Sequence, residues 1–354
     1  MGRFVLGIMK DVLIVGFGLA GLSIAAHAED NNLSLKIISN KSQMSSKIAG
    51  GILNPIAVKR MKPVWKVEEF LPYAKSYYML LESRYGSKFY HSKLIKVAIH
   101  NIEQENNWYQ SYDKLRVQPH IQKLLETNTD VNIKIKRLGS IKAGVVDLKL
   151  LFQSSRDYHS KKKMWIEDTF KYTNLKFING NIEYNNEIYK HLIFCEGFGT
   201  TINPFFKDLG IYGNKGDYLI IESSQLKYNH LLKSKYFLIP LGNNLYKYGA
   251  TYQRSPLNHQ PSEEAKSQMV EALNKMISSP YKVVDQLCGI RPTTKDRKPI
   301  LGTHKNYKNI HILNGFGSRG VMTSPLLGKN LIEHIFEGTP LDKEVSIDRI
   351  YART

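Results

Sequence analysis

The sequence predicts an α/β protein with a Rossmann-like dinucleotide-binding domain and an inserted substrate domain built on a mixed or antiparallel sheet. Three observations predict this fold: a glycine fingerprint near the N-terminus, short glycine-containing motifs spread along nearly the whole chain, and several strand-like segments in its middle. With 354 residues, the chain can bury a sizeable core in one large domain or in two.

The first element is an apolar strand that breaks into glycines. Residues 11–26 read DVLIVGFGLAGLSIAA, which places Gly16, Gly18 and Gly21 at GxGxxG spacing. Gly16 permits a tight turn, Gly18 lets the backbone approach a pyrophosphate, and Gly21 lets the following helix pack closely on the strand. The first turn of that helix, which includes Ala20, presents unpaired N–H groups and a positive dipole end to an anion.

The next elements follow in order. Residues 33–39 predict the second strand, where Ser39 or Asn40 stands in place of the acidic residue that usually binds the adenosine ribose. Either side chain can still hydrogen-bond a hydroxyl, so both are candidate ribose ligands. Residues 66–85 carry apolar residues at helical spacing and predict a helix. Asp147 is placed to cap another helix, which begins LKLLFQSS.

The second half of the chain adds strands and two helices. Strands are expected at residues 192–195, 218–222, 236–240 and 245–251. Ser262 is placed to cap a helix that ends before Pro280. The last helix is expected to begin at Ser324-Pro325, with proline at its first position, and to end at Gly338.

The expected domains are discontinuous, because the nucleotide-binding elements lie at both ends and in the middle of the chain. The dinucleotide-binding domain is assigned to residues 1–59, 138–204 and 286–354. The two insertions, residues 60–137 and 205–285, are assigned to the substrate domain.

The net charge of +19 has two interpretations. It can indicate an acidic partner such as RNA. However, most of the cations are lysines, and the chain is also rich in Asn, Ile and Tyr, which an AT-rich coding bias explains equally well. Residues 161–163 form a tight basic cluster, which is expected to be a solvated loop. RNA binding is therefore possible but not favoured.

Cysteine usage and hydropathy favour a cytoplasmic protein. Cys195 and Cys288 are too few for a disulfide framework or a zinc site, and no metal site is expected. No run reaches the length of a transmembrane helix. Residues 11–28 do not predict a signal peptide, because Asp11 and three glycines interrupt the apolar run.

Five further segments line up with the fingerprint in a fixed order. They read SSKIAGGILNP from Ser45, LIFCEGFGTT, FLIPLGNNLYKYGATY, GIRPTTKDRKPILG and GFGSRGVMTSPLLG. In this order, over nearly the whole chain, the sequence resembles the D-amino-acid oxidase family of FAD-dependent oxidoreductases, which includes glycine and sarcosine oxidases. The resemblance implies oxidation of the C–N bond of a small amine or amino acid, by hydride transfer to flavin. Oxygen or another acceptor then reoxidises the flavin.

The motifs resemble two branches of this family. GIRPTTKDRKPILG looks like glycine oxidase, whereas GSRGVMTSPLL looks like the FAD domain of the bifunctional tRNA 5-methylaminomethyl-2-thiouridine enzymes, which acts on a wobble-uridine side chain. The second branch normally carries a methyltransferase domain, for which this chain has no room. A third hypothesis is a flavin-binding redox partner without turnover, which the missing acidic residue at Ser39 supports.

The resemblance, together with the chemistry of the residues, implies a set of site residues. Arg291, held extended before a proline, is suited to bind a substrate carboxylate, and Arg319 is a second candidate at the substrate. The alternative for Arg291 is an ion pair with Asp296. FAD is expected to be non-covalent, because residues 293–302 contain no cysteine. The cofactor-binding residues are expected to be Gly16, Gly18, Ala20, Gly21, Ser39, Asn40, Ser46, Ala49, Gly50, Gly51, Gly197, Gly317, Ser318, Gly320, Val321, Met322 and Thr323.

Overall fold

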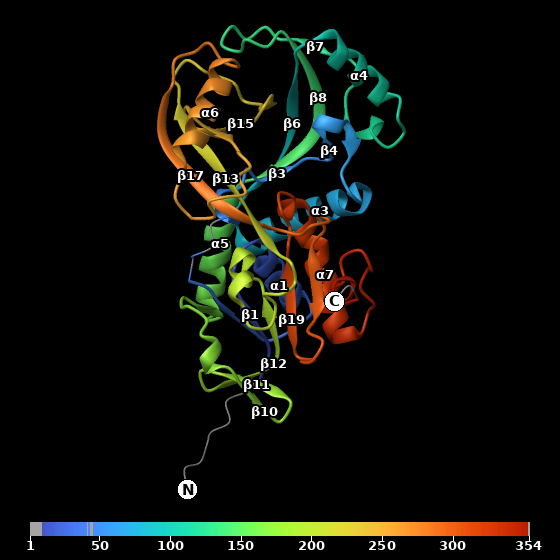
Figure 1. Ribbon diagram of the computed structural model, residues 1–354, viewed down its shortest axis with the longest axis vertical. Helices are drawn as coiled ribbons and strands as arrows, with labels where there is room; N and C mark the ends of the chain where they lie inside the picture. The colour runs from blue at the N-terminus through green and yellow to red at the C-terminus, as the bar shows by residue number, and fades with distance from the viewer. Residues whose placement is uncertain (1–8, 41, 43–44, 353–354) are drawn as a thin grey trace.

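Two β-sheets organise the chain, one in each half of the elongated molecule (Figure 1). The structure is a computed structural model that describes residues 9–40, 42 and 45–352. The first eight residues of the expected dinucleotide-binding domain therefore lie outside the described residues. No helix in the described ranges is long and apolar enough to cross a membrane.

The first sheet has eight strands and a parallel centre. Five of its strands run parallel in the spatial order β9, β2, β1, β12, β19. The strands of this sheet are β1 (Lys10–Val15), β2 (Leu35–Ile38), β9 (Trp165–Ile166), β10 (Lys176–Ile178), β11 (Asn181–Tyr184), β12 (Glu187–Phe194), β18 (Ile300–Thr303) and β19 (Ile310–Asn314). This arrangement confirms the predicted Rossmann-like unit.

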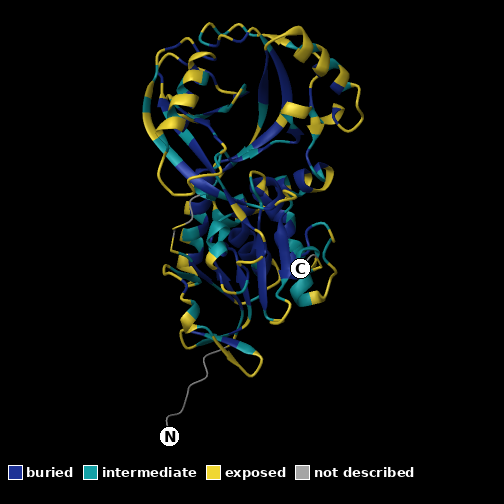
Figure 2. Cartoon of the chain, in the orientation of Figure 1, coloured by how far each residue is buried: buried dark blue, intermediate teal, exposed yellow. Residues whose placement is uncertain are grey.

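Four helices pack on one face of this sheet around buried side chains such as Val12 and Ile14. They are α1 (Leu19–Asp30), α3 (Val67–Tyr85), α5 (Leu148–Lys161) and α7 (Gly320–Glu337). The opposite face buries Leu13 and Val15 beneath an aromatic cluster that includes Phe206. The central strands are therefore covered on both faces, as the dark interior of Figure 2 shows.

The second sheet has nine strands, and among its pairs only β14 and β6 run parallel. It is therefore mixed, as predicted. Its strands are β3 (Ile52–Leu53), β6 (Tyr90–Ile99), β7 (Glu126–Thr127), β8 (Arg137–Val146), β13 (Tyr212–Glu222), β14 (Leu231–Lys233), β15 (Phe237–Gly242), β16 (Leu245–Gly249) and β17 (Lys282–Thr293). Helix α6 (Glu263–Asn274) buries Met269 against this sheet, and α4 (Ile102–Tyr112) buries Trp108 in a separate cluster with β6 and β8.

Short elements complete the chain and bear on the domain boundaries. They are α2 (Ser45–Ile48), α8 (Asp348–Tyr351) and the strand pair β4 (Ile56–Ala57) and β5 (Lys62–Pro63). The division into domains remains a prediction. Strands β8 and β17 both belong to the second sheet, whereas the expected boundaries at 138 and 286 assign most of each strand to the dinucleotide-binding part.

Local signals located several helix ends correctly. The predicted helix over residues 66–85 is α3. The Asp147 carboxylate accepts a hydrogen bond from the Leu150 N–H at 3.0 Å, and the Ser262 hydroxyl accepts one from the Ala265 N–H at 3.3 Å. Both residues are therefore N-caps, as predicted, because each side chain supplies an acceptor for an otherwise unpaired N–H.

The prediction for the last helix is wrong at its start. Helix α7 begins at Gly320, so Pro325 lies inside it rather than at its first position. A proline has no N–H to donate to the carbonyl four residues earlier, which is that of Val321. The Tyr78 hydroxyl of α3 donates to this carbonyl at 2.7 Å instead. At the other end, Gly338 caps the helix with a φ of 74°, as predicted.

Replacing Tyr78 with phenylalanine tests whether its hydroxyl serves the Val321 carbonyl in place of the N–H that Pro325 lacks. Tyr78 is fully buried, so Tyr78→Phe leaves the Val321 carbonyl without a donor away from water. We expect the free energy of unfolding to fall by about 1–3 kcal/mol, measured by urea denaturation. Tyr248→Phe is the matched control, because the buried Tyr248 hydroxyl has no hydrogen-bond partner in the described chain. The control should be neutral or slightly stabilising, and equal losses in both variants would contradict the assignment.

Candidate functional site

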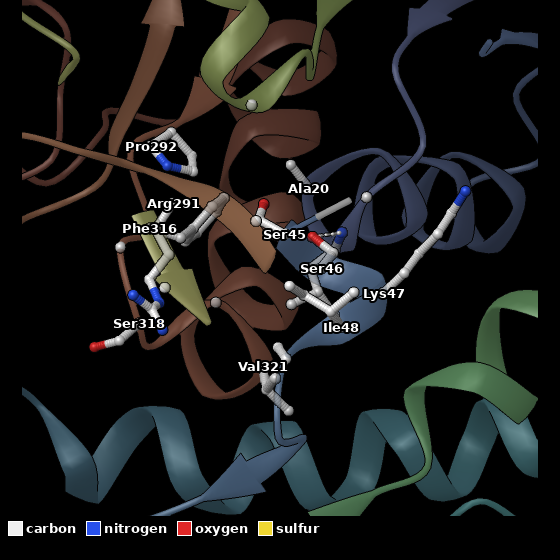
Figure 3. A pocket seen from close by; sticks show the side chains of 18 of the residues that line it. Ala20, Ser45, Ser46, Lys47, Ile48, Arg291, Pro292, Phe316, Ser318 and Val321 are labelled. Atoms are coloured by element: carbon white, nitrogen blue, oxygen red, sulfur yellow. Dashed lines mark hydrogen bonds between the residues drawn. The ribbon is translucent and has the colours of Figure 1, made fainter. Parts of the chain in front are cut away.

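A cavity of about 600 Å³ lies between the carboxyl ends of the first sheet and one face of the second. The first sheet contributes the ends of β1, β2 and β12, and the second contributes residues of β13, β15 and β17. Figure 3 shows side chains that converge on it from α2, from β17 and from the start of α7. The site therefore joins segments that are far apart in the sequence.

The glycine fingerprint forms one wall of the cavity. Gly16 has a φ of +93°, and a Cβ at this position would lie 2.5 Å from the Cys195 carbonyl oxygen. A Cβ on Gly18 would lie 2.8 Å from the Ser46 hydroxyl, which accepts a hydrogen bond from the Leu19 N–H. The N-cap residue of α1 is Gly18, which has no side chain to cap the following N–H groups. Its first turn, which includes Ala20, thus offers N–H groups to an anion in the cavity.

Two residues that were predicted to bind the cofactor, Gly21 and Thr323, do not line the cavity. Gly21 faces the turn before the helix, where a Cβ would lie 2.0 Å from the Gly16 carbonyl oxygen. Its absent side chain permits the close contact of helix and strand that the fingerprint predicts. Thr323 is buried, and its hydroxyl donates to the Arg319 carbonyl at 3.1 Å. The structure therefore places both residues behind the wall of the cavity.

The loop from Ala49 to Gly51 forms a second wall. A Cβ on Gly50 would lie 2.7 Å from the Ile239 side chain, and one on Gly51, whose φ is +69°, would lie 2.0 Å from the Val146 carbonyl oxygen. From behind the loop, Lys247 Nζ donates to the carbonyls of Ile48 at 3.2 Å and Ala49 at 3.3 Å. Glycine is therefore needed here because the loop is pressed against the second sheet.

The start of α7 forms a third wall, with Gly317, Ser318, Gly320, Val321 and Met322 along it. Helix α7 has no side-chain N-cap, so its first N–H groups are not all satisfied within the helix. Gly197, also predicted, lines the cavity at the end of β12. The positive end of the helix dipole thus acts from residue 320, one turn earlier than the sequence suggested.

The predicted ribose ligands lie together at the end of β2. Ser39 and Asn40 both line the cavity, and the Asn40 amide donates to the Thr169 hydroxyl at 3.1 Å. Sequence reasoning missed the two carboxylates that line this cavity, Asp168 and Glu196. Glu196 accepts hydrogen bonds of 2.6 Å from Tyr172 and Asn203, and its burial raises the pKa of the carboxyl group. Its position directly after the β12 strand and before Gly197 was the available signal.

Arg291 lies on the opposite side of the cavity, on β17. Its Nη1 donates to the Asn214 side chain at 3.1 Å and to the Thr251 carbonyl at 3.2 Å, and its guanidinium stacks over the Tyr252 ring, 4.6 Å from the ring centroid. Within the described ranges no carboxylate pairs with it. Asp296, the alternative partner, instead accepts from Arg349 at 3.1 Å.

Two tyrosines that the sequence did not single out border Arg291. Tyr218 lies beside Gly50, and burial raises the pKa of its phenol although the positive charge of Arg291 acts in the opposite direction. Tyr252 is 66% exposed and lines the mouth of the cavity. The Tyr218 phenol is therefore neutral at physiological pH, so its hydroxyl remains a donor.

The charged side chains that line the second-sheet half of the cavity are cationic. They are Lys59, Lys233, Lys235 and Arg291, and Arg319 stands beside them before α7. Lys233 donates to the carbonyls of Ser234 and Lys235, and its burial lowers its pKa to about 8. This half of the cavity is thus suited to an anionic ligand.

Comparison with known proteins assigns the family. The model of the FAD dependent oxidoreductase family matches residues 11–334, and the chain belongs to this family. This confirms the resemblance to D-amino-acid oxidases that the motifs indicated, and FAD is the cofactor of the family.

Solved structures of the same fold cover nearly the whole chain. Glycine oxidase from Bacillus cereus is 19% identical, with a TM-score of 0.75 over 94% of this chain and 96% of that one. Iminodiacetate oxidase from Chelativorans sp. is 17% identical, with a TM-score of 0.74 over 95% and 99%. L-α-glycerophosphate oxidase from Mycoplasma pneumoniae, solved with FAD bound, is 16% identical, with a TM-score of 0.70 over 92% and 94%. At these identities the likeness establishes the fold alone.

The three walls fit FAD. Gly16, Gly18, Gly50 and Gly51 all line the cavity, and a Cβ on any of them would clash with the surrounding protein, so bare backbone faces the site where a dinucleotide needs close approach. The first turns of α1 and α7, whose N-cap residues form no side-chain cap, supply N–H donors for anionic groups, and Ser39 and Asn40 supply hydroxyl and amide groups. The donor set thus corresponds to a molecule with a pyrophosphate and hydroxyl groups.

Proposed function

We propose that the protein oxidises the C–N bond of a small amine that carries a carboxylate, such as glycine, sarcosine or another amino acid. The observation that carries this proposal is the guanidinium of Arg291, which lines the cavity without a carboxylate partner among the described residues. The Nη1 atom of Arg291 donates two hydrogen bonds, and both end on neutral acceptors. A substrate carboxylate would satisfy the remaining charge through a charge-assisted hydrogen bond.

Two of the similar structures support this choice of substrate by their names. Glycine oxidase and iminodiacetate oxidase are named for molecules that carry an amine beside a carboxylate. Glycerophosphate oxidase, in contrast, is named for an alcohol phosphate, so the fold alone does not select an amine. The discriminating feature is therefore the chemistry of the cavity wall around Arg291.

In this proposal one set of cavity residues holds the cofactor and another set orients the substrate. The starts of α1 and α7, with the loop from Ala49 to Gly51, would hold FAD without a covalent bond. Burial raises the pKa of Cys195, the cysteine at the cavity, which disfavours the thiolate that a covalent link needs. FAD, when bound, supplies a two-electron acceptor for the C–N bond, and water hydrolyses the resulting imine.

The cationic wall also selects the protonation state of the substrate. Arg291, Lys233 and Arg319 line the cavity, and nearby positive charges lower the pKa of a bound ammonium group. The substrate is therefore held with a neutral amine, whose lone pair assists oxidation of the adjacent carbon. Arg291 binds the carboxylate, and Tyr218 donates from its neutral phenol beside Gly50. In this proposal oxygen or another small oxidant is the final acceptor.

An anaerobic screen tests the proposed function. The purified holoenzyme is mixed with glycine, sarcosine, D-amino acids and L-amino acids, and bleaching of the flavin absorbance near its visible maximum is recorded. We expect bleaching by at least one amine that carries a carboxylate. A protein that stays colourless with added FAD would exclude the proposal, and flavin that no amine reduces would favour a redox partner without turnover.

A second candidate substrate is the wobble-uridine side chain of a tRNA, which the charge of the cavity wall favours. Lys59 and Lys235 are exposed, and neither forms an ion pair with any other described residue. Binding of an anticodon stem-loop is tested by filter retention at two salt concentrations. Tight binding that Lys59→Glu weakens, together with flavin reduction by modified tRNA and not by free amino acids, would favour the RNA substrate.

A further inference from the structure

Two charged residues of β13 are buried without a charged partner. Lys215 is 1% exposed and Asp217 is fully buried, and neither forms an ion pair within the part of the chain that the structure describes. Buried charges normally require compensation by pairing and hydrogen bonds. The Asp217 Oδ2 atom has no hydrogen-bond partner at all among these residues. Their burial therefore needs a reason other than a favourable pair.

The side chains of both residues hold one segment, residues 251–262, which runs from the end of β16 to the N-cap of α6 with neither helix nor strand. Lys215 Nζ donates to the Asn258 side chain at 2.8 Å and to the Gln260 carbonyl. Asp217 Oδ1 accepts from the Ser262 N–H at 2.9 Å and from the Gln286 side chain of β17 at 3.0 Å. Charge-assisted hydrogen bonds of this kind are stronger than those between neutral groups. The two residues thus fix the far end of the segment.

The backbones of the same two residues hold the near end. The N–H and carbonyl of Lys215 both bond Gln253, each at 2.9 Å. The Asp217 N–H donates to the Thr251 hydroxyl at 2.9 Å, and the Thr251 N–H donates to the Asp217 carbonyl at 3.1 Å. The segment is therefore anchored to one edge of β13 near both of its ends.

This anchored segment supplies two of the contacts that hold Arg291. The Thr251 carbonyl accepts from Arg291 Nη1, and the Tyr252 ring stacks on the guanidinium. From β13 itself, Asn214 supplies the third contact, and the absent side chain of Gly216 leaves room: a Cβ there would lie 2.2 Å from Arg291 Nη2. The position of the guanidinium thus depends on where residues 251 and 252 are held.

We propose that Lys215 and Asp217 are positioning residues that set the guanidinium of Arg291 by anchoring residues 251–262. This inference rests on the proposed function, because it assigns the anchored guanidinium to binding a carboxylate. Neither residue is among those that line the cavity. Both act through the segment, and their loss is expected to affect carboxylate binding more than cofactor binding.

The experiment compares Lys215→Met and Asp217→Ala with the wild-type holoenzyme. Benzoate serves as the carboxylate probe and benzamide as its uncharged counterpart, and binding is followed by the change in the flavin spectrum. Hydrogen exchange of residues 251–262 is measured in parallel. We expect exchange in the segment to speed up at least about tenfold. The benzoate Kd is expected to rise at least about tenfold, with the Kd values of benzamide and FAD changing less than about twofold.

Two further variants make the result specific. Lys96→Met removes another buried lysine of the second sheet, one that bonds Glu126 and Ser140 and has no contact with the segment, so it should leave the benzoate Kd unchanged. Asp217→Asn keeps an Oδ1 acceptor for Ser262 and should retain most of the benzoate affinity. If Asp217→Ala does not fold, the same measurements on Lys215→Met and Asp217→Asn still test the proposal.

The outcomes separate this inference from the proposed function. The positioning role is wrong if Arg291→Ala weakens benzoate binding while Lys215→Met and Asp217→Ala speed up exchange in residues 251–262 and leave the benzoate Kd unchanged. A segment that stays protected in both variants would overturn it as well. If Arg291→Ala itself leaves the benzoate Kd unchanged, it is the proposed function that fails.

Discussion

Arg291→Ala is expected to lower kcat/KM for an amino-acid substrate at least about 100-fold, which corresponds to about 2.7 kcal/mol of transition-state stabilisation. The variant removes a cation from the cavity wall and leaves the substrate carboxylate unpaired where water is partly excluded. An amine without a carboxylate should lose far less. Arg291→Lys should restore little, because an ammonium group cannot reproduce the planar guanidinium that stacks on Tyr252.

The control for this variant is Arg116→Ala. Arg116 is an exposed arginine paired with Glu68 on the surface, so its loss changes the net charge by the same amount without touching the cavity. Its kcat/KM should stay within about twofold of wild type, because exposed ion pairs contribute little. Release of FAD from Arg291→Ala, or an equal loss of activity toward all amines, would make Arg291 a structural residue.

Gly16→Ala is expected to weaken FAD binding at least about 100-fold, measured by fluorescence titration of the apoprotein with FAD. The φ of Gly16 is +93°, and its Cβ would lie 2.5 Å from the Cys195 carbonyl oxygen, so either the turn or the end of β12 must move. Both border the cavity. The free energy of unfolding should fall as well, because the strain is present without the cofactor.

Gly180→Ala separates the effect of backbone conformation from that of the cavity. Gly180 has a similar φ of +77°, but nothing lies within 4 Å of its Cβ position. This variant should lose about 1 kcal/mol of stability and none of its affinity for FAD. If Gly16→Ala binds FAD as tightly as Gly180→Ala does, then the glycine fingerprint does not form the cofactor site.

Local signals located the glycine fingerprint and two of the helix caps because those features depend on residues adjacent in sequence. Gly16 and Gly18 were assigned from their spacing between an apolar strand and an apolar helix, and Asp147 from its place before an apolar run. Pro325 shows where such rules stop. The preference of proline for the first turn of a helix placed Pro325 at the start of α7. In the structure it lies within the helix, because Tyr78, 243 residues away from Val321 in the sequence, donates to the carbonyl that Pro325 cannot serve.

The surroundings of Arg291 were not predictable for the same reason. Asn214 reaches it only because β13 and β17 pair in the register that sets Asn214 opposite Arg291. Tyr252 lies between residues 251 and 253, which hydrogen bonds to the backbones of Asp217 and Lys215 hold at the edge of β13. A pattern read along the chain contains neither the register nor the fold of that segment. The chemistry of Arg291 was therefore predictable, whereas the residues that position it were not.

Product analysis after one anaerobic turnover tests the central proposal most directly, because it reports which bond is oxidised. The holoenzyme is mixed with the amine that bleaches its flavin, and the products are quantified after acid quenching. Cleavage of the C–N bond predicts one carbonyl product and one released amine or ammonia for each FAD reduced. Flavin reduced by a hydroxy acid or an alcohol phosphate, with no amine released from any amino acid, would contradict it.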